Sequence, residues 1–411
     1  MIVDPGSLTT GLWTPPWPDL SLNLLPPDFS SSSAAFDIPQ PPPARPPHDG
    51  NQAHHRGTSR SQTRTDSVRA SIAGGEWFLA SSTWRIEHWN PPSREAYPPS
   101  VLTNFTRGLQ AWVRRWVLDG HSPYIHRSLY ADGNRFPACV QDAYLSASLY
   151  QHKTPQNEAL VYRILDEHVA ALLASQPVVA GDGDAASLLE TRDHLARVHA
   201  LHVYTVIRLF DGSVAQRAAA EAQLPTLSLW NKLLWESART DAETLTRTLG
   251  PHASGDCEDP APSADQRVDA RPEGVRDEDP ADTYDSDLMT WNLWVLSEAI
   301  RRTWIVVTCT LGVYSALKGQ WGECAGGTYF TARAGLWDAP SAPRWAAMRR
   351  GRGADDSFFV RSGDGEALLR TAAAAEVDEF ARHLFTCIWG LDRIEDWALK
   401  TASAGEVLLV Y

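Results

Sequence analysis

The chain has 411 residues, of which 43% are apolar and 17 are tryptophan, so it contains ample material for a hydrophobic core. The net charge of −13 is concentrated in residues 254–287, which hold twelve acidic residues and three arginines, so it says little about partners of the folded part. The first residues lack a basic region followed by an apolar run, so we expect no secretory signal. No apolar run approaches the roughly 18 residues of a spanning helix, so we expect no membrane span.

Residues 1–75 differ in composition from the rest of the chain. Twelve of the 28 prolines lie in the first 50 positions, together with a run of serines at 30–33. Such a segment buries too little apolar surface to offset its chain entropy, so we predict a disordered tail. Aromatic residues and leucines interleaved with aspartate at 13–29 are typical of acidic activation segments, but a tail without a role is favoured. Arginines at 45–69 form a weak basic arm, for which a solvated linker is the favoured interpretation.

The folded part is predicted to be all-α, a large helical domain at 76–400 followed by a tail at 401–411. Apolar residues recur with the helical period over long stretches, and period-2 alternation is sustained nowhere. After an extended aromatic segment at 77–89, we expect helices at 101–117, 137–151, 154–174 with Thr154 as N-cap, 185–210, 214–249 with an interruption at Pro225, 291–317 and 365–400. We expect a disordered acidic loop at 251–286 before the helix at 291–317, and a compact turn region at 326–345 after it.

The most hydrophobic stretch is the predicted central helix at 291–317. Its apolar residues follow the helical period at Leu293, Leu296, Ile300, Trp304, Val307, Leu311 and Tyr314. Further apolar residues lie on its other faces, as expected for a helix in the middle of a core. Glu298, Arg301 and Arg302 interrupt the run and argue against a lipid-spanning helix, so we predict that they pair inside a protein core.

Three histidines in one predicted helix, His194, His199 and His202, are the best metal candidates. His199 and His202 are three residues apart and could bind one ion, but a third ligand would have to come from elsewhere. His194 lies about 12 Å from His202 along a helix, too far for a shared ion. We favour packed, hydrogen-bonded histidines.

Other candidate sites are weaker. His121 and His126 flank Ser122 and Ser128, but no nucleophile elbow or orienting carboxylate accompanies them, so a structured loop is favoured. The glycine pairs at 326–327 and 351–353 lack the lysine and the strand–turn–helix context of a phosphate loop. The acidic run at 277–287 is predicted to be solvated rather than metal-binding. We therefore assign no catalytic, cofactor-binding or metal residue and no cofactor.

The five cysteines are Cys139, Cys257, Cys309, Cys324 and Cys387. No two of them form a CxxC or zinc-finger pair. Three lie inside apolar helical patterns, which favours reduced, buried thiols in an intracellular protein.

Five long motifs carry a resemblance to one family. They are SPYIHRSLY (122–130), CVQDAYLSASLYQHKTPQNEALVYRILDEHVAALL (139–173), ARVHALHVYTVIRLFDGSVAQRAAAE (196–221), WNLWVLSEAIRRTWIVV (291–307) and FTARAGLWDAPSAPRW (330–345). In this order they resemble the C-terminal regulatory region of fungal zinc-cluster (Zn2Cys6) transcription factors, over about residues 76–400. The resemblance implies an all-helical effector region, a nuclear location, frequent dimers and control of fungal genes, often of secondary-metabolite clusters.

The family's DNA-binding module is missing from this pattern. That module has six cysteines that hold two zinc ions, whereas the first cysteine here is Cys139, inside the predicted helical domain. Three explanations stay open: a regulator without a zinc cluster that acts through a partner, a gene model that lacks its first exon, and a decayed paralogue. No DNA-binding or zinc residue is therefore carried over.

The resulting prediction is a transcriptional regulator or co-regulator in the nucleus, and not an enzyme. Its expected partner is a protein, either a second copy or a DNA-binding regulator, and promoter DNA is reached indirectly. No membrane partner is expected, and the small-molecule effector is unknown. Two alternatives stay open, a helical enzyme of a biosynthetic pathway with a tryptophan-lined cavity, and a small-molecule-sensing protein of such a pathway.

Overall fold

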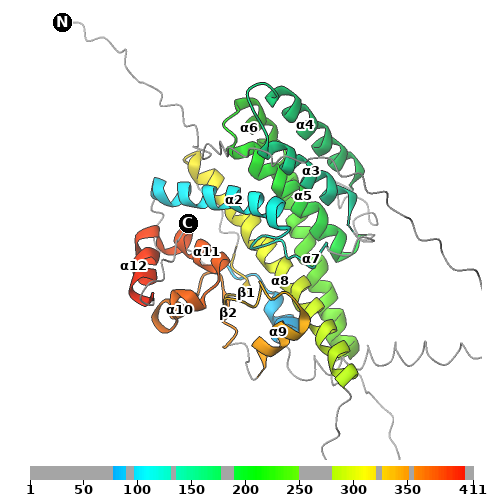
Figure 1. The fold of residues 1–411 in the computed structure, drawn as a ribbon, viewed down its shortest axis with the longest axis vertical. Helices are drawn as coiled ribbons and strands as arrows, with labels where there is room; N and C mark the ends of the chain where they lie inside the picture. Colours follow the sequence, from blue (N-terminus) through cyan, green and yellow to red (C-terminus); the bar gives the residue numbers. More distant parts are fainter. Residues whose placement is uncertain are drawn as a thin grey trace, which may run out of the picture. The chain divides into compact units, whose positions relative to one another are not determined.

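The computed structural model describes residues 77–88, 97–130, 136–176, 189–249, 280–320, 326–350 and 356–402. All of them belong to one compact unit, Thr63–Tyr411. They are mostly helical, which confirms the all-α prediction (Figure 1). The predicted disordered tail at 1–75 lies outside the described residues, as do residues 251–279 of the predicted acidic loop and all but the first two residues of the predicted tail at 401–411.

The central helix is α8, Pro280–Leu317, shown in yellow-green and yellow in Figure 1. Every residue from Ser297 to Val307 is buried, so the helix lies inside the core on all its faces as predicted. It begins at Pro280 instead of near residue 291, and the predicted loop at 251–286 is therefore wrong over its last residues. Proline is favoured in the first turn of a helix and so are acidic residues, which explains why an acidic, proline-containing stretch is helical here.

Six helices from the N-terminal part of the unit pack around α8 and one another. They are α2 (Pro99–Asp119), α3 (Ala138–Gln151), α4 (Glu158–Ser175), α5 (Thr191–Phe210), α6 (Val214–Glu221) and α7 (Leu224–Leu249). Helix α5 contacts α3, α4, α6, α7 and α8, and it is buried almost all round. The core thus contains two neighbouring helices, α5 and α8, each enclosed by the others.

Two further predicted helix starts differ from the structure. Helix α4 begins at Glu158, because the side chain of Asn157 accepts a hydrogen bond from the Thr154 amide and holds a turn before the helix. Helix α5 begins at Thr191, and residues 185–188 lie outside the described residues. The predicted interruption at Pro225 is confirmed: α6 ends at Glu221 and α7 begins at Leu224, so Pro225 lies in the first turn of α7, where its missing amide proton costs no hydrogen bond.

The aromatic segment at the start of the described chain is not extended. It forms two short 3₁₀ helices, η1 (Trp77–Leu79) and η2 (Ser81–Trp84). Phe78 and Trp84 are buried in the core instead of covering its surface. The backbone carbonyls of Phe78 and Thr83 accept hydrogen bonds from Arg301 of α8, as described below, and these bonds hold the segment against the helix.

The C-terminal part is a set of short elements instead of the single predicted helix at 365–400. It comprises β1 (Tyr329–Thr331), α9 (Ala342–Arg349), β2 (Phe359–Arg361), α10 (Glu366–Thr371), η5 (Ala374–Glu376), α11 (Glu379–Trp389) and α12 (Leu391–Thr401). Strand β1, which lies inside the predicted turn region, pairs antiparallel with β2, with Phe330 opposite Val360. Gly390, with φ of +88°, separates α11 from α12.

Two further observations bear on the predictions. None of the helices in the described ranges combines the length and the unbroken apolar character that crossing a bilayer requires. Cys139, Cys309 and Cys387 are unpaired, and burial raises the pKa of the Cys139 and Cys309 thiols to about 11 and about 12. Cys257 and Cys324 lie outside the described residues.

Candidate functional site: the polar core of helix α8

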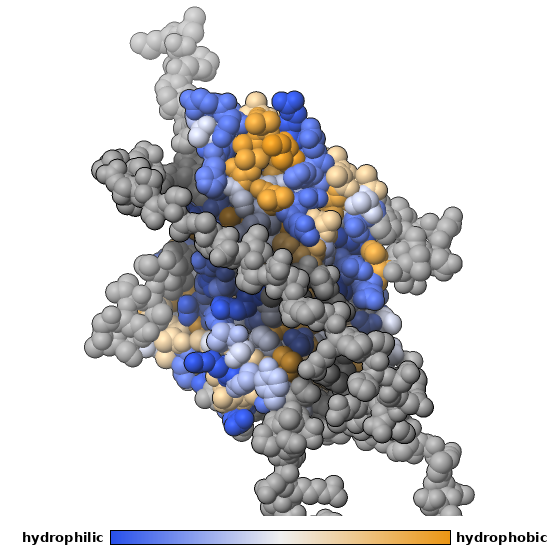
Figure 2. Space-filling model, turned by 45° about the vertical axis from the view of Figure 1, so that its right-hand side comes forward, coloured by the Kyte–Doolittle hydropathy of each residue, from blue (hydrophilic) through white to orange (hydrophobic). Residues whose placement is uncertain are grey.

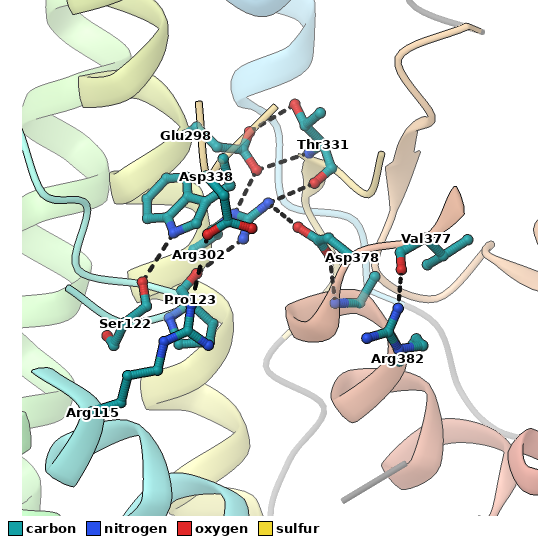
Figure 3. Close-up of polar contacts among 12 residues, drawn as sticks. Arg115, Ser122, Pro123, Glu298, Arg302, Thr331, Asp338, Val377, Asp378 and Arg382 are labelled. Atoms are coloured by element: carbon teal, nitrogen blue, oxygen red, sulfur yellow. Dashed lines mark hydrogen bonds and ion pairs between the residues drawn. The ribbon is translucent and has the colours of Figure 1, made fainter. Parts of the chain in front are cut away.

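Arg302 is the centre of a buried network of polar groups on α8 (Figure 3). Its guanidinium donates through Nε to Glu298 (2.9 Å), and through its terminal nitrogens to Asp378 and to the carbonyl oxygens of Pro123 (2.9 Å) and Thr331 (2.8 Å). Its side chain is 1% exposed. Arg302 therefore joins four separate parts of the fold at one point: α8, the 121–130 loop, β1 and the start of α11.

The two carboxylates of this network are also saturated. Glu298 accepts hydrogen bonds from the backbone amide (2.9 Å) and the hydroxyl (3.0 Å) of Thr331. Asp378 accepts from the amide of Ala381 (2.8 Å) and thereby caps the N-terminus of α11. Every partner of both carboxylates is a donor, as ionised carboxylates require. Burial disfavours the charge of Arg302, but Asp378 and Glu298 outweigh this effect and raise its pKa.

Arg301, the next residue, has partners of a different kind. It donates to the carbonyl oxygens of Phe78 (3.0 Å) and Thr83 (2.8 Å) and to the Thr83 hydroxyl (2.9 Å), and its guanidinium lies 4.1 Å from the centre of the Trp84 ring. Burial lowers its pKa to about 9, against the opposing effect of Glu298, so it remains charged at neutral pH. Carbonyl dipoles and an aromatic face thus hold the charge and attach η1 and η2 to α8. These two arginines and the two carboxylates, Glu298 and Asp378, are called the arginine network below.

The second half of α8 faces two buried histidines of α5. His202 contacts the Thr310 hydroxyl through Nε2 (2.9 Å) and the Tyr124 hydroxyl through Nδ1 (3.2 Å). Thr310 donates its own proton to the carbonyl of Val306 (2.7 Å), so His202 Nε2 must carry a proton. Burial lowers the pKa of His202 to about 3, so the imidazole is neutral and Nδ1 accepts from the Tyr124 hydroxyl.

His199 has the same kind of surroundings. It contacts the hydroxyls of Thr303 (2.7 Å) and Tyr130 (2.8 Å), and burial followed by the nearby His202 lowers its pKa to about 3. His199 and His202 with their four hydroxyl partners are called the histidine cluster below. The cluster connects α5, α8 and the 121–130 loop through hydrogen bonds between uncharged groups.

The metal hypothesis for the three histidines is not supported by their contacts. The two histidines of the cluster use their ring nitrogens on hydroxyl groups, and His194 Nδ1 lies 2.8 Å from a terminal nitrogen of Arg197, a cation. Within the described ranges, no three histidine, cysteine, aspartate or glutamate side chains are grouped so that they could hold a metal ion. The histidines have the hydrogen-bonded core positions that the sequence favoured.

The Ser/His candidates in the 121–130 loop also have local structural roles. His126 Nδ1 lies 2.7 Å from the Ser128 hydroxyl, and burial lowers the pKa of His126 to about 3, too low for a general base at neutral pH. The Ser122 hydroxyl accepts from the amide of Ile125 (3.1 Å), and its carbonyl accepts from the Trp337 indole (2.9 Å). His121 lies beside Arg127, with 3.1 Å between their nitrogens.

The glycines do not form a phosphate loop in the described chain. Gly326 has φ of +84°, and a Cβ there would lie 2.2 Å from Ile86, so glycine allows the 86–88 segment to approach closely. Gly327 pairs with Glu87 through two backbone hydrogen bonds of 3.0 and 2.7 Å. Gly351 and Gly353 lie outside the described residues, as does the start of the acidic run at 277–279, while residues 280–287 belong to α8.

The sequence pattern identified Glu298, Arg301 and Arg302 but missed most of their partners. Asp378 could have been found as a helix N-cap, because an aspartate followed by the apolar, helix-periodic residues of α11 is a start signal. The hydroxyl partners of the histidines gave no such signal, because isolated threonines and tyrosines occur at many positions.

Comparisons with known proteins give one informative match. The chain is 28% identical over 280 residues to Transcription factor gsfR2 from Penicillium aethiopicum, and the match covers 68% of this chain and 57% of the relative. The chain therefore spans little more than half the length of that relative. No family model matches the chain, and no solved structure matches it. The chain is thus homologous to a fungal transcription factor.

Proposed function

We propose that the protein is a transcriptional regulator or co-regulator of fungal genes, acting in the nucleus through a helical effector domain and not as an enzyme. The observation that carries this proposal is the match to a protein named as a transcription factor, which extends over 68% of the chain. The long motifs at 122–130, 139–173 and 291–307 support it, because they resemble the regulatory region of zinc-cluster factors. Genes of a secondary-metabolite cluster are the proposed targets, on the strength of that resemblance.

The polar groups of the core support a regulatory rather than a catalytic role. Side chains that an enzyme would direct at a substrate have structural partners here. Glu298 accepts from Arg302 and Thr331, and His199 contacts two hydroxyl groups. The tryptophans of α8 pack on other tryptophan rings, Trp294 on Trp345 at 5.4 Å and Trp304 on Trp235 at 5.3 Å between centroids. These rings fill the core, which weighs against the tryptophan-lined cavity of the alternative hypotheses.

We further propose that the protein reaches promoters through a protein partner, either a second copy or a DNA-binding regulator. Arg301 and Arg302 of α8 are buried and their terminal nitrogens donate to protein groups inside the core, so these two cations are not available to phosphate groups.

The test is deletion of the gene combined with transcript profiling and with chromatin immunoprecipitation of the tagged protein. The expected result is a nuclear signal, a coordinated change in a limited set of genes and enrichment of the protein at their promoters. Purified protein should show no sequence-specific binding to the same promoter fragments until the partner is added. Unchanged transcripts together with the absence of a nuclear signal would refute the proposal.

A further inference from the structure

The α3–α4 hairpin carries an apolar face on its outer side. Leu145 of α3 and Leu160 of α4 are 59% and 51% exposed, and Leu149 and Ile164, each one helical turn further on, are half-buried. Residues four apart lie on the same side of a helix, so each helix presents a pair. Figure 2 shows an apolar patch, ringed by hydrophilic residues, in the upper part of the view, on the side where α3 and α4 lie. These four residues are called the hairpin face.

Apart from Leu149, which also packs against the core, the hairpin face is additional to the side that each helix buries. Helix α4 already buries Val161, Leu165, Val169 and Leu172. The two helices are held side by side by a hydrogen bond of 2.7 Å between the Ser146 hydroxyl and His168 Nδ1, close to the four residues of the face. A surface helix needs one apolar stripe, so a second contiguous stripe across two helices indicates a binding surface for another protein.

Two charges beside the face identify what it binds. Arg163 and Glu167 are exposed on the solvent side of α4, one turn apart. In the described part of the chain neither forms an ion pair, whereas Asp166 of the same helix pairs with Arg208 at 2.7 Å. Consider a helix with opposite charges at positions i and i+4 that packs against a second copy of itself about a perpendicular two-fold axis. The two helices are then antiparallel, and each charge faces the opposite charge of the other copy. The surface is therefore complementary to itself.

We propose that the hairpin face is a self-association surface on which the same hairpin of a second copy of this chain packs about a two-fold axis. With the axis near Leu165, Arg163 of each copy faces Glu167 of the other. Leu160 then lies level with the exposed Ala170 and Ala171, whose small side chains leave room for it. The two hairpins form a four-helix arrangement with the apolar pairs at its centre. This inference specifies which of the proposed partners occupies this face, and in that sense it rests on the proposed function.

The first experiment measures the mass of the full chain by sedimentation velocity over a wide range of protein concentration. The expected result is a concentration-dependent dimer. Leu145→Glu and Leu160→Glu are expected to shift the protein to the monomer, because each places a charge in the apolar part of the interface. Leu399→Glu is the matched control, since Leu399 is 78% exposed on α12, away from the hairpin, and its substitution should leave the dimer unchanged.

The second experiment uses charge reversal, which remains informative even if a leucine variant fails to fold. Arg163→Glu and Glu167→Arg are each expected to weaken self-association about tenfold or more, because like charges then face each other. An equimolar mixture of the two variant proteins is expected to restore it, because each variant supplies the charge that the other requires. Circular dichroism checks that each variant keeps its helix content.

Three results would overturn the inference: a wild-type chain that is monomeric at every concentration, leucine variants that dimerise like wild type, or a mixture of charge variants no tighter than either one alone. These outcomes are separate from a failure of the proposed function. If the protein is monomeric but deletion of its gene changes transcription, only the self-association surface is refuted. If the protein is a dimer but deletion of its gene changes no transcript, the regulatory role is refuted and the self-association surface stands.

Discussion

The polar core of α8 and the outer face of the α3–α4 hairpin use similar residues in opposite ways. In the core, Arg302 and its two carboxylates are fully buried and each is saturated by protein partners. On the hairpin, leucines are exposed while Arg163 and Glu167 have no ion-pair partner among the described residues. Charges that are paired inside a core fix the arrangement of one chain, whereas unpaired charges beside an apolar face are suited to selecting a second one.

The largest effect is expected from Arg302→Met. The substitution leaves Glu298 and Asp378 buried without their cation, so unfolding should become easier by about 3–5 kcal/mol. Urea unfolding followed by tryptophan fluorescence measures it. Arg163→Met is the matched control on the hairpin and should change stability by less than about 0.5 kcal/mol. Equal effects at the two positions would remove the distinction between the two regions.

A second variant separates lost pairing from lost packing. Adding Glu298→Leu to Arg302→Met removes one of the two stranded carboxylates, so the double variant should be more stable than Arg302→Met alone. A double variant that is less stable by the sum of both single effects would show that the residues act independently.

A comparable loss is expected from Trp304→Ala on the same helix. Trp304 is 6% exposed and packs on Trp235, so its removal leaves a cavity in the core and should cost about 3–5 kcal/mol in chemical unfolding. A loss below about 1 kcal/mol would contradict the placement of this side chain in a tightly packed core.

The histidine cluster should make stability depend on pH. Burial lowers the pKa of His199 and His202 to about 3, so both stay neutral in the folded protein, while unfolded histidines take up protons below about pH 6.5. The stabilisation is present above pH 6.5 and is lost as the pH falls toward 3, by about 1.4 kcal/mol per unit and per histidine. Urea unfolding at a series of pH values measures this slope.

The control for the pH effect is a histidine outside the core. His202→Gln should reduce the slope between pH 6.5 and 5, whereas His152→Gln, at an exposed position at the end of α3, should not. A slope that is the same in His202→Gln and wild type would show that the cluster does not control the acid sensitivity.

A smaller effect is expected where Gly108 of α2 lies against α11. A Cβ on Gly108 of α2 would lie 2.1 Å from the His383 ring of α11, so Gly108→Ala should destabilise by about 1–3 kcal/mol. On α8, a Cβ on the exposed Gly312 would have no neighbour within 4 Å. Gly312→Ala should therefore stabilise by about 0.5–1 kcal/mol, because alanine favours the helix. Thermal unfolding of the two variants should shift in opposite directions.

The smallest effect on stability is expected on the hairpin. Leu160→Ser exchanges an exposed leucine for a polar residue and should change monomer stability by less than about 0.5 kcal/mol. The measurement is made at low protein concentration, where self-association does not contribute. A loss of 2 kcal/mol or more would show that the hairpin face supports the chain's own fold.

The helices were well predicted from the sequence, because a helix that buries one side has apolar residues spaced three or four apart, which is a local pattern. This pattern missed the N-terminal extension of α8, since a proline followed by aspartates fits both a loop and a first helical turn. It joined α10, η5, α11 and α12 into one helix, because their apolar residues keep a similar spacing across the breaks. The spacing gives no information on the Arg333–Val377 pairing or on Gly390, which separate them.

The partners inside the core were less predictable than the helices. Arg302 was correctly expected to pair in the core, and Glu298 was found because it lies one turn away. Pro123 and Asp378 lie 179 and 76 residues away, and a local pattern cannot indicate which distant loop passes beside an arginine. The exposed leucines of the hairpin were visible in the sequence, but only the structure shows which side of α3 and α4 the core already occupies.

The long sequence separation between Arg302 and its hydrogen-bond partners has a consequence for the folding of the protein during synthesis. Its partners extend from Pro123 to Asp378, so the last of them leaves the ribosome long after the arginine itself. Until then a nascent chain holds a cation whose pairing is incomplete, and the surrounding helices cannot close over it without a large desolvation cost. The helical unit should therefore complete its folding late and cooperatively, and fragments that end before Asp378 should remain sensitive to proteases.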